Sequence, residues 1–117
     1  KIPTTNKYIA AIAAAKSSGA IVLLKGARTA IAQSDGKVTI VPRSTPALAR
    51  GGSGDVLTGL IGGLIATHIH SDLSIAEIVA TAAWWHSQAA ILAATTRTDL
   101  GVDPLILTEY LNTAIAS

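Results

Sequence analysis

The sequence predicts an α/β fold, and three observations point to it. A helical pattern leads through a glycine into a continuous apolar run (7–24), two β-prone segments flank an Asp-Gly pair (29–41), and two long, weakly charged helical stretches follow (56–66 and 75–94). Half of the residues are hydrophobic and 14% are charged, which is typical of a folded chain rather than a disordered one. A length of 117 residues is enough for one compact domain.

The first predicted unit is a helix over 7–18 followed by a strand over 20–24. The apolar residues that recur at helical spacing are Tyr8, Ile9, Ile12 and Ala15. Gly19 stands where a C-cap glycine belongs. The run 20–24 is aliphatic throughout, which predicts a strand that is buried on both faces of a parallel sheet.

A β-hairpin is expected next. The segments 29–32 and 37–41 have strand character, and the four residues between them include Asp35-Gly36, a strong turn signal. The segment 42–50 contains two prolines and keeps neither a helical nor a strand period, so we expect a loop there.

The second half of the sequence predicts three helices. No charged residue occurs over 56–66, so we expect the first of these helices to be surrounded by protein. Its three glycines should each weaken the helix by about 1 kcal/mol relative to alanine, and close packing against a neighbour would compensate. These glycines are Gly59, Gly62 and Gly63.

The other two helices have recognisable starts. Ser74 and Glu77 have the spacing of a capping box, which predicts a helix from there to about residue 94. Asp103-Pro104 predicts the start of the last helix, with Pro104 at its first position.

Composition excludes several classes of function. The net charge is only +2 and the nine basic residues are scattered, whereas nucleic-acid binding would require a basic patch. The absence of cysteine excludes disulfides and cysteine-based metal sites.

The apolar stretches 56–65 and 75–94 are too short or too polar to predict a membrane span, so a cytoplasmic location is expected. Because the sequence begins with Lys1 and contains no methionine, we expect it to be part of a longer protein.

The segment Gly51-Gly52-Ser53-Gly54-Asp55 is the most informative one for function. Three glycines in four positions allow backbone N–H groups to converge without interference from Cβ atoms. The helix that follows adds its free N–H groups and the positive end of its dipole. This construction predicts an anion site, most plausibly for a nucleotide phosphate. It lacks the Gly-Lys-Ser/Thr of a P-loop and the glycine spacing of a Rossmann fingerprint.

Asp55 has two interpretations. An aspartate in the first turn of a helix commonly complements the helix dipole. Beside a phosphate, a carboxylate is instead well placed to act as a general base that deprotonates an attacking hydroxyl.

Four cations precede the glycine-rich segment or lie at its start. These are Lys25, Arg28, Arg43 and Arg50. They fit a small anionic ligand better than a polymer, but ordinary surface charge explains them equally well. For Lys25 the alternative is a surface lysine at the end of a strand.

Two motifs carry a resemblance to a known family. The segment from Ala49 to Leu57, Ala-Arg-Gly-Gly-Ser-Gly-Asp-Val-Leu, resembles the Ala-Thr-Gly-Gly-x-Gly-Asp-Val-Leu motif of the ADP-dependent NAD(P)H-hydrate dehydratases, which are ribokinase-like proteins. The upstream segment 22–29 is similar to that family's strand ending in Lys-Gly-x-x-Thr. His86 matches a family position on the long helix, although a helix histidine with its hydrogen bonds satisfied is the simpler interpretation. Arg50 stands where the family has threonine.

The resemblance implies a ribokinase-like three-layer α/β/α fold, with residues 1–117 as the C-terminal part of the catalytic domain and its nucleotide-binding side. It implies that Lys25, Gly26, Ala27, Arg28 and Thr29 line the phosphate and ribose of the nucleotide. Gly51, Gly52, Ser53 and Gly54 would form the turn that holds the nucleotide, with Gly54 binding through its backbone. Asp55 would contact the hydrated nicotinamide and act as the base. No residue is assigned to a metal.

The implied activity is a lyase reaction that repairs hydrated NADH and NADPH. The C6 hydroxyl of the hydrate attacks the terminal phosphate of ADP (or ATP), with Mg²⁺ expected, and phosphate then leaves to restore NAD(P)H. The implied partners are the missing N-terminal half or an epimerase domain, and a homo-oligomer is possible. Two other readings stay open: a ribokinase-like kinase for a small-molecule hydroxyl, and a non-catalytic nucleotide-binding domain.

Overall fold

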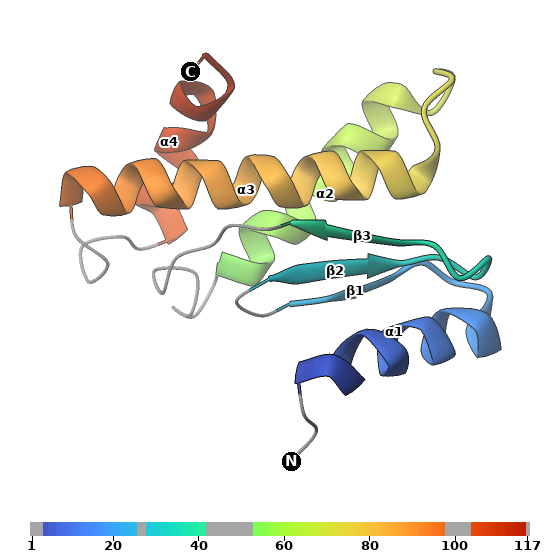
Figure 1. Cartoon of the computed structure of the whole chain (residues 1–117). Helices are drawn as coiled ribbons and strands as arrows, with labels where there is room; N and C mark the ends of the chain where they lie inside the picture. The colour runs from blue at the N-terminus through green and yellow to red at the C-terminus, as the bar shows by residue number, and fades with distance from the viewer. Residues whose placement is uncertain (1–3, 26–27, 42–52, 98–103, 117) are drawn as a thin grey trace. The chain divides into compact units, whose positions relative to one another are not determined.

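A computed structural model describes residues 4–25, 28–41, 53–97 and 104–116. The chain forms two compact units, Lys1–Pro42 and Arg43–Ser117, and each is described by itself. The elements, labelled in Figure 1, are α1 (Thr4–Ser18), β1 (Val22–Leu24), β2 (Thr29–Ala32), β3 (Val38–Val41), α2 (Ser53–His68), α3 (Ile75–Arg97) and α4 (Pro104–Ala116). The predicted order of helix, strand, hairpin and three helices is confirmed.

In the first unit, α1 packs against a three-stranded sheet with the strand order β1-β2-β3. Ala11 and Ala15 are four residues apart and therefore lie on the same face of α1. Both are buried in a cluster with Ala32 of β2. Because these side chains are small, the helix backbone can lie close to the sheet. Larger residues fill in around the cluster, namely Ile12, Val22, Leu24 and Val38.

The first strand was predicted to be buried on both faces of a parallel sheet. For the strands described, this prediction is wrong. β1 pairs antiparallel with β2, with Val22 opposite Ala32 and Leu24 opposite Ala30. All three residues of β1 are half-buried. The apolar run does not indicate the direction of the partner strand. The length of the connection to β2 does indicate it, because four residues are too few for the crossover that parallel strands require.

Both turns predicted in the first unit are confirmed. Gly19 ends α1 with a φ of 72°, and its N–H donates to the carbonyl of Ala15 at 2.9 Å. Gly36 has a φ of 92° in the hairpin turn, where a side chain would be strained. The Asp35 carboxylate accepts a hydrogen bond from the Lys37 N–H at 2.9 Å, so that β3 begins at Val38, one residue later than expected.

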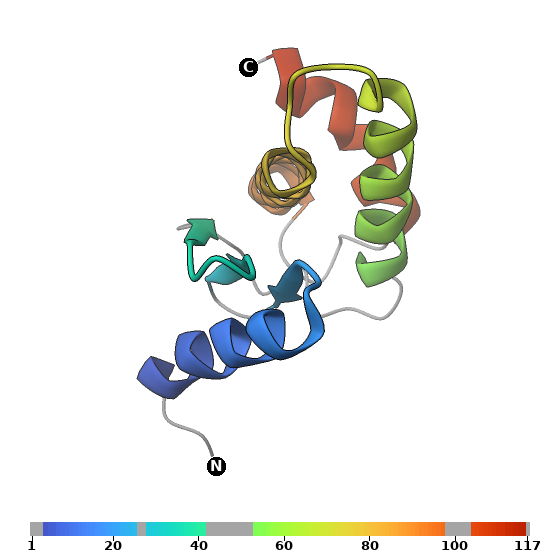
Figure 2. The same cartoon turned by 90° about the vertical axis from the view of Figure 1, so that its right-hand side faces the viewer.

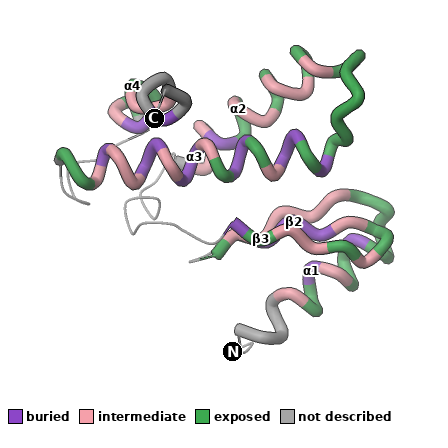
Figure 3. The backbone as a smooth tube through the Cα atoms, turned by 45° about the horizontal axis from the view of Figure 1, so that its top comes forward, coloured by how far each residue is buried: buried purple, intermediate pink, exposed green. Residues whose placement is uncertain are grey.

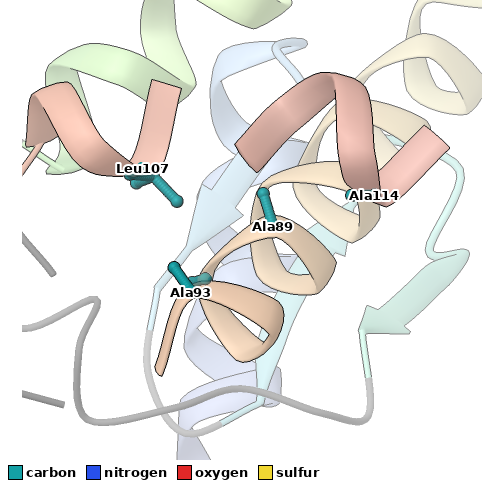
Figure 4. Packing of buried hydrophobic residues seen from close by; sticks show 5 residues of the cluster. Ala89, Ala93, Leu107 and Ala114 are labelled. Atoms are coloured by element: carbon teal, nitrogen blue, oxygen red, sulfur yellow. The ribbon is translucent and has the colours of Figure 1, made fainter. Parts of the chain in front are cut away.

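In the second unit, α3 packs against both α2 and α4, and α2 also contacts α4. Figure 2 looks nearly along α3 and shows α2 and α4 on the same side of it. One buried cluster of this unit consists of Ala89, Ala90, Ala93, Leu107 and Ala114 (Figure 4). The alanines of α3 let α4 approach closely, and Leu107 supplies the largest buried side chain of the cluster.

The predicted helix starts are confirmed. The Ser74 hydroxyl accepts a hydrogen bond from the Glu77 N–H, and the Glu77 carboxylate accepts one from the Ser74 N–H, both at 3.1 Å. This reciprocal pair is the capping box that the sequence indicated. α3 continues to Arg97, three residues beyond the expected end. α4 begins at Pro104, as expected.

The expectation that the glycines of α2 pack closely against a neighbour is wrong. Gly59, Gly62 and Gly63 are exposed, and among the described residues no atom of another element would lie within 4 Å of a Cβ added at any of them. α2 instead packs through Leu57, which is buried, and Val56, which contacts the core around Leu107. Figure 3 colours α2 mainly as exposed and half-buried, whereas α3 has buried residues along its length. Within the described residues, this face of α2 is therefore uncovered although it carries no charge.

No helix in the described ranges is both long enough and apolar enough to cross a lipid bilayer.

The two adjacent tryptophans have different environments. Trp85 is half-buried against the core of the second unit, and its indole N–H donates to the carbonyl of Leu111 in α4 at 2.6 Å. Trp84 is 48% exposed. The hydrogen bond of Trp85 therefore ties α3 to α4, whereas Trp84 contributes little to this packing.

We expect Trp85→Phe to lower the free energy of unfolding by about 1 kcal/mol, because it removes this hydrogen bond from the partly buried carbonyl. The matched variant Trp84→Phe should change stability by less than about 0.5 kcal/mol. Urea denaturation followed by circular dichroism measures both. Equal effects of the two substitutions would show that the α3–α4 hydrogen bond does not stabilise the unit.

Candidate functional site

The glycine-rich motif leads into the N-terminus of α2. This helix begins at Ser53, so Ser53 and Gly54 belong to its first turn rather than to a turn that precedes it. Gly51 and Gly52 lie outside the described residues. The first N–H groups of an α-helix have no carbonyl partner within the helix, and the helix dipole is positive at this end. The predicted phosphate-binding residues that are described therefore lie where an anion is favoured.

Asp55 is exposed and lies in the first turn of α2. Leu57, two residues later, is on nearly the opposite side of the helix and is 5% exposed. Val56 packs against the cluster that contains Leu107. These two apolar residues anchor the first turn to the rest of the unit, so that the Asp55 carboxylate is presented to solvent on a supported helix end. Such a carboxylate is accessible to a ligand and able to accept a proton.

The structure adds one residue that the sequence analysis did not single out. The Thr58 hydroxyl donates a hydrogen bond to the carbonyl of Gly54 at 2.9 Å. A threonine four residues after a glycine at a helix start was the available signal, because threonine hydroxyls often bond to the carbonyl of the preceding turn.

The second predicted segment lies at one end of the sheet in the first unit. Leu24 of β1 is opposite Ala30 of β2, so the end of β1 and the start of β2 lie side by side. Lys25 and Arg28 are exposed, and Thr29, the first residue of β2, is half-buried. Gly26 and Ala27 lie outside the described residues. This end of the sheet therefore carries two cationic residues and one residue with a hydroxyl group.

The predicted nucleotide-binding residues thus form two local groups, one on each unit. Lys25, Arg28 and Thr29 belong to the first unit, and Ser53, Gly54 and Asp55 belong to the second. Arg43 and Arg50 lie outside the described residues.

His86 lies in the middle of α3 and is 2% exposed. It interacts with a neighbouring group. Every buried side-chain nitrogen and oxygen in the described segments has a hydrogen-bond partner. These findings agree with the interpretation of His86 as a helix histidine with its hydrogen bonds satisfied, and they show in addition that it is buried.

A dedicated metal cage is absent from the described residues, which contain no group of three or more histidine and carboxylate side chains that could hold an ion.

Comparison with known proteins identifies the family. Residues 3–113 match the NAD(P)H-hydrate dehydratase family. The chain belongs to this family. Its sequence is 60% identical over 98 residues to the bifunctional NAD(P)H-hydrate repair enzyme Nnr of Synechocystis, a match that covers 84% of this chain and 18% of that enzyme. The chain therefore spans about a fifth of the length of that relative.

Two solved Bacillus subtilis structures have a region with the same fold as this chain. YxkO aligns with a TM-score of 0.88 and 27% identity over 98% of this chain and 43% of its own. The ADP/ATP-dependent NAD(P)H-hydrate dehydratase, co-crystallised with ATP and Mg²⁺ and soaked with CoA, aligns with a TM-score of 0.87 and 28% identity over 96% and 40%. These likenesses confirm the predicted ribokinase-like α/β fold.

Proposed function

We propose that this chain supplies the nucleotide phosphate site and the catalytic base of an ADP-dependent NAD(P)H-hydrate dehydratase. The observation that carries the proposal is the exposed carboxylate of Asp55 in the first turn of α2, immediately after a glycine-rich segment. The family to which the chain belongs supports the reaction type. The proposal includes a cytoplasmic location, since its substrates are soluble nicotinamide and adenine nucleotides.

The proposed reaction couples dehydration to phosphoryl transfer. Asp55 accepts the proton of the C6 hydroxyl of the hydrate as the oxygen attacks the terminal phosphate of ADP. A new P–O bond forms at this oxygen while the bond between the two phosphates of ADP breaks, and AMP is released. The C–O bond at C6 then breaks while a proton leaves the adjacent ring carbon for solvent, which restores the ring double bond of NAD(P)H and yields inorganic phosphate.

The chain's own groups have distinct tasks in this scheme. The free N–H groups at the start of α2, including that of Gly54, stabilise negative charge on the transferring phosphoryl group. Lys25 and Arg28 supply cationic donors, and Thr29 supplies a hydroxyl, on the phosphate and ribose side. ATP is the alternative co-substrate.

Mg²⁺ supplies charge neutralisation at the phosphates when it is bound. Mg²⁺ is usually held by phosphate oxygens and water rather than by a cage of protein ligands. We assign no residue of the chain to the ion.

The activity can be tested by complementation. The chain matches only part of the Synechocystis repair enzyme, so we expect it to be inactive alone. Mixed with that enzyme lacking the matching segment, it should restore ADP-dependent conversion of NADH hydrate to NADH, measured by the absorbance of NADH. No ADP-dependent conversion in the mixture would contradict the proposal. Phosphorylation of a panel of alcohols, without conversion of the hydrate, would instead indicate a small-molecule kinase.

A further inference from the structure

The hydrogen bond from Thr58 to Gly54 lies inside the candidate phosphate site. The Thr58 hydroxyl donates to the Gly54 carbonyl at 2.9 Å, and Thr58 itself is exposed. The carbonyl of Gly54 and the N–H of Asp55 belong to the same peptide group. This peptide group lies in the first turn of α2, where N–H groups have no acceptor within the helix. The bond from Thr58 therefore acts on a peptide whose donor is available to a ligand.

A hydrogen bond to a carbonyl oxygen changes the opposite side of the same peptide. It draws electron density toward the oxygen, which makes the N–H a stronger donor. It also restrains the orientation of the peptide plane, which matters at Gly54 because glycine has more backbone freedom than any other residue. Both effects favour an anion that accepts from the Asp55 N–H.

We propose that Thr58 is a positioning residue of the nucleotide site, which fixes and polarises the peptide between Gly54 and Asp55 so that its N–H donates to the nucleotide phosphate. This inference rests on the proposed function, because it requires a phosphate at the start of α2. Thr58 acts through the peptide group, and its own hydroxyl is engaged with the Gly54 carbonyl.

The same type of hydrogen bond occurs elsewhere, so its location decides its effect. Thr67 donates to the carbonyl of Gly63 at 2.8 Å in the same helix. The N–H that shares a peptide with that carbonyl belongs to Leu64, in the helix interior, where N–H groups bond to the carbonyl four residues earlier. Polarising that peptide strengthens a hydrogen bond within the helix, and its N–H is not available to a ligand. Thr67 is therefore a matched control, with the same donor, the same acceptor type and the same helix.

The test compares ADP binding by the wild-type chain and three variants in an NMR titration with ¹⁵N-labelled protein. Thr58→Val should weaken ADP binding by about 3- to 10-fold, the effect of one typical hydrogen bond. It should also reduce the shift of the Asp55 amide signal on ADP addition. Thr58→Ser, which keeps the hydroxyl, should bind within about twofold of wild type, because the hydrogen bond is retained. Thr67→Val should leave ADP affinity unchanged.

Thermal unfolding of the same variants separates positioning from stability. The two valine variants should have similar Tm values, since each loses one hydrogen bond of the same kind. The inference is overturned if Thr58→Val binds ADP as wild type does, or if Thr67→Val weakens binding equally. If the wild-type chain itself shows no ADP binding, the proposed function fails and this inference fails with it.

Discussion

Replacement of Asp55 by asparagine is expected to lower turnover of NADH hydrate by about 10²- to 10⁴-fold, the contribution typical of a general base. The amide cannot accept the hydroxyl proton, although it has nearly the same shape as the carboxylate. Affinity for ADP should be equal or higher, because the substitution removes a negative charge beside the phosphate. The measurement is NADH formation by the complemented enzyme, together with a separate titration of ADP.

A second aspartate provides the control for this prediction. Asp72 is also exposed and lies in the second unit, between α2 and α3. Asp72→Asn makes the same chemical change far along the sequence from the glycine-rich segment, and we expect wild-type turnover. Full activity of the complemented Asp55→Asn enzyme would show that Asp55 is not the base and only complements the helix dipole. This result would favour the non-catalytic interpretation.

Replacement of Leu107 by alanine should lower the free energy of unfolding by about 2–5 kcal/mol. Leu107 is 1% exposed and packs among the alanines of α3 and α4, as Figure 4 shows. The neighbouring alanines have no side-chain length with which to fill the space that the substitution would leave. The cost should therefore fall in the upper part of this range, measured by urea denaturation.

Leu105 is the matched control on the same helix. Its side chain is 79% exposed, so Leu105→Ala should change stability by less than about 0.5 kcal/mol. If the two leucine variants unfold at the same urea concentration, the described packing of α4 on α3 does not form in solution.

Several elements were predictable because their signals are local. Gly19 and Gly36 have positive φ values at the two places where the sequence indicated a helix end and a hairpin turn. The hydrogen bonds between Ser74 and Glu77 depend only on residues three positions apart. Pro104 can start a helix because its missing N–H is not needed there. In each case the preference is determined by backbone chemistry within one turn.

The two wrong predictions concern packing between segments that are distant in the sequence, which local sequence patterns do not determine. The apolar run that ends in β1 predicted burial on both faces, but a strand with this composition pairs equally well with an antiparallel neighbour. The glycines of α2 predicted a close neighbour, but a glycine is also compatible with an open helix face. Burial depends on what other segments cover, and no residue in either stretch encodes that directly.

The candidate site was predictable in part. The position of Asp55 at the start of a helix follows from the glycine-rich segment, and the structure confirms it. Thr58 was not predicted, because its position four residues after Gly54 was a signal that the sequence analysis did not use. Its hydrogen bond to Gly54 became visible only in the structure. The roles of Lys25, Arg28 and Thr29 in nucleotide binding stay predictions.

A crystal structure of the chain with ADP bound tests the central claim most directly. The account predicts that the terminal phosphate accepts hydrogen bonds from backbone N–H groups of the first turn of α2, while the Asp55 carboxylate makes no contact with that phosphate and faces the hydrated nicotinamide side. ADP bound elsewhere on the chain, with the first turn of α2 facing solvent or closed by a protein side chain, would contradict it.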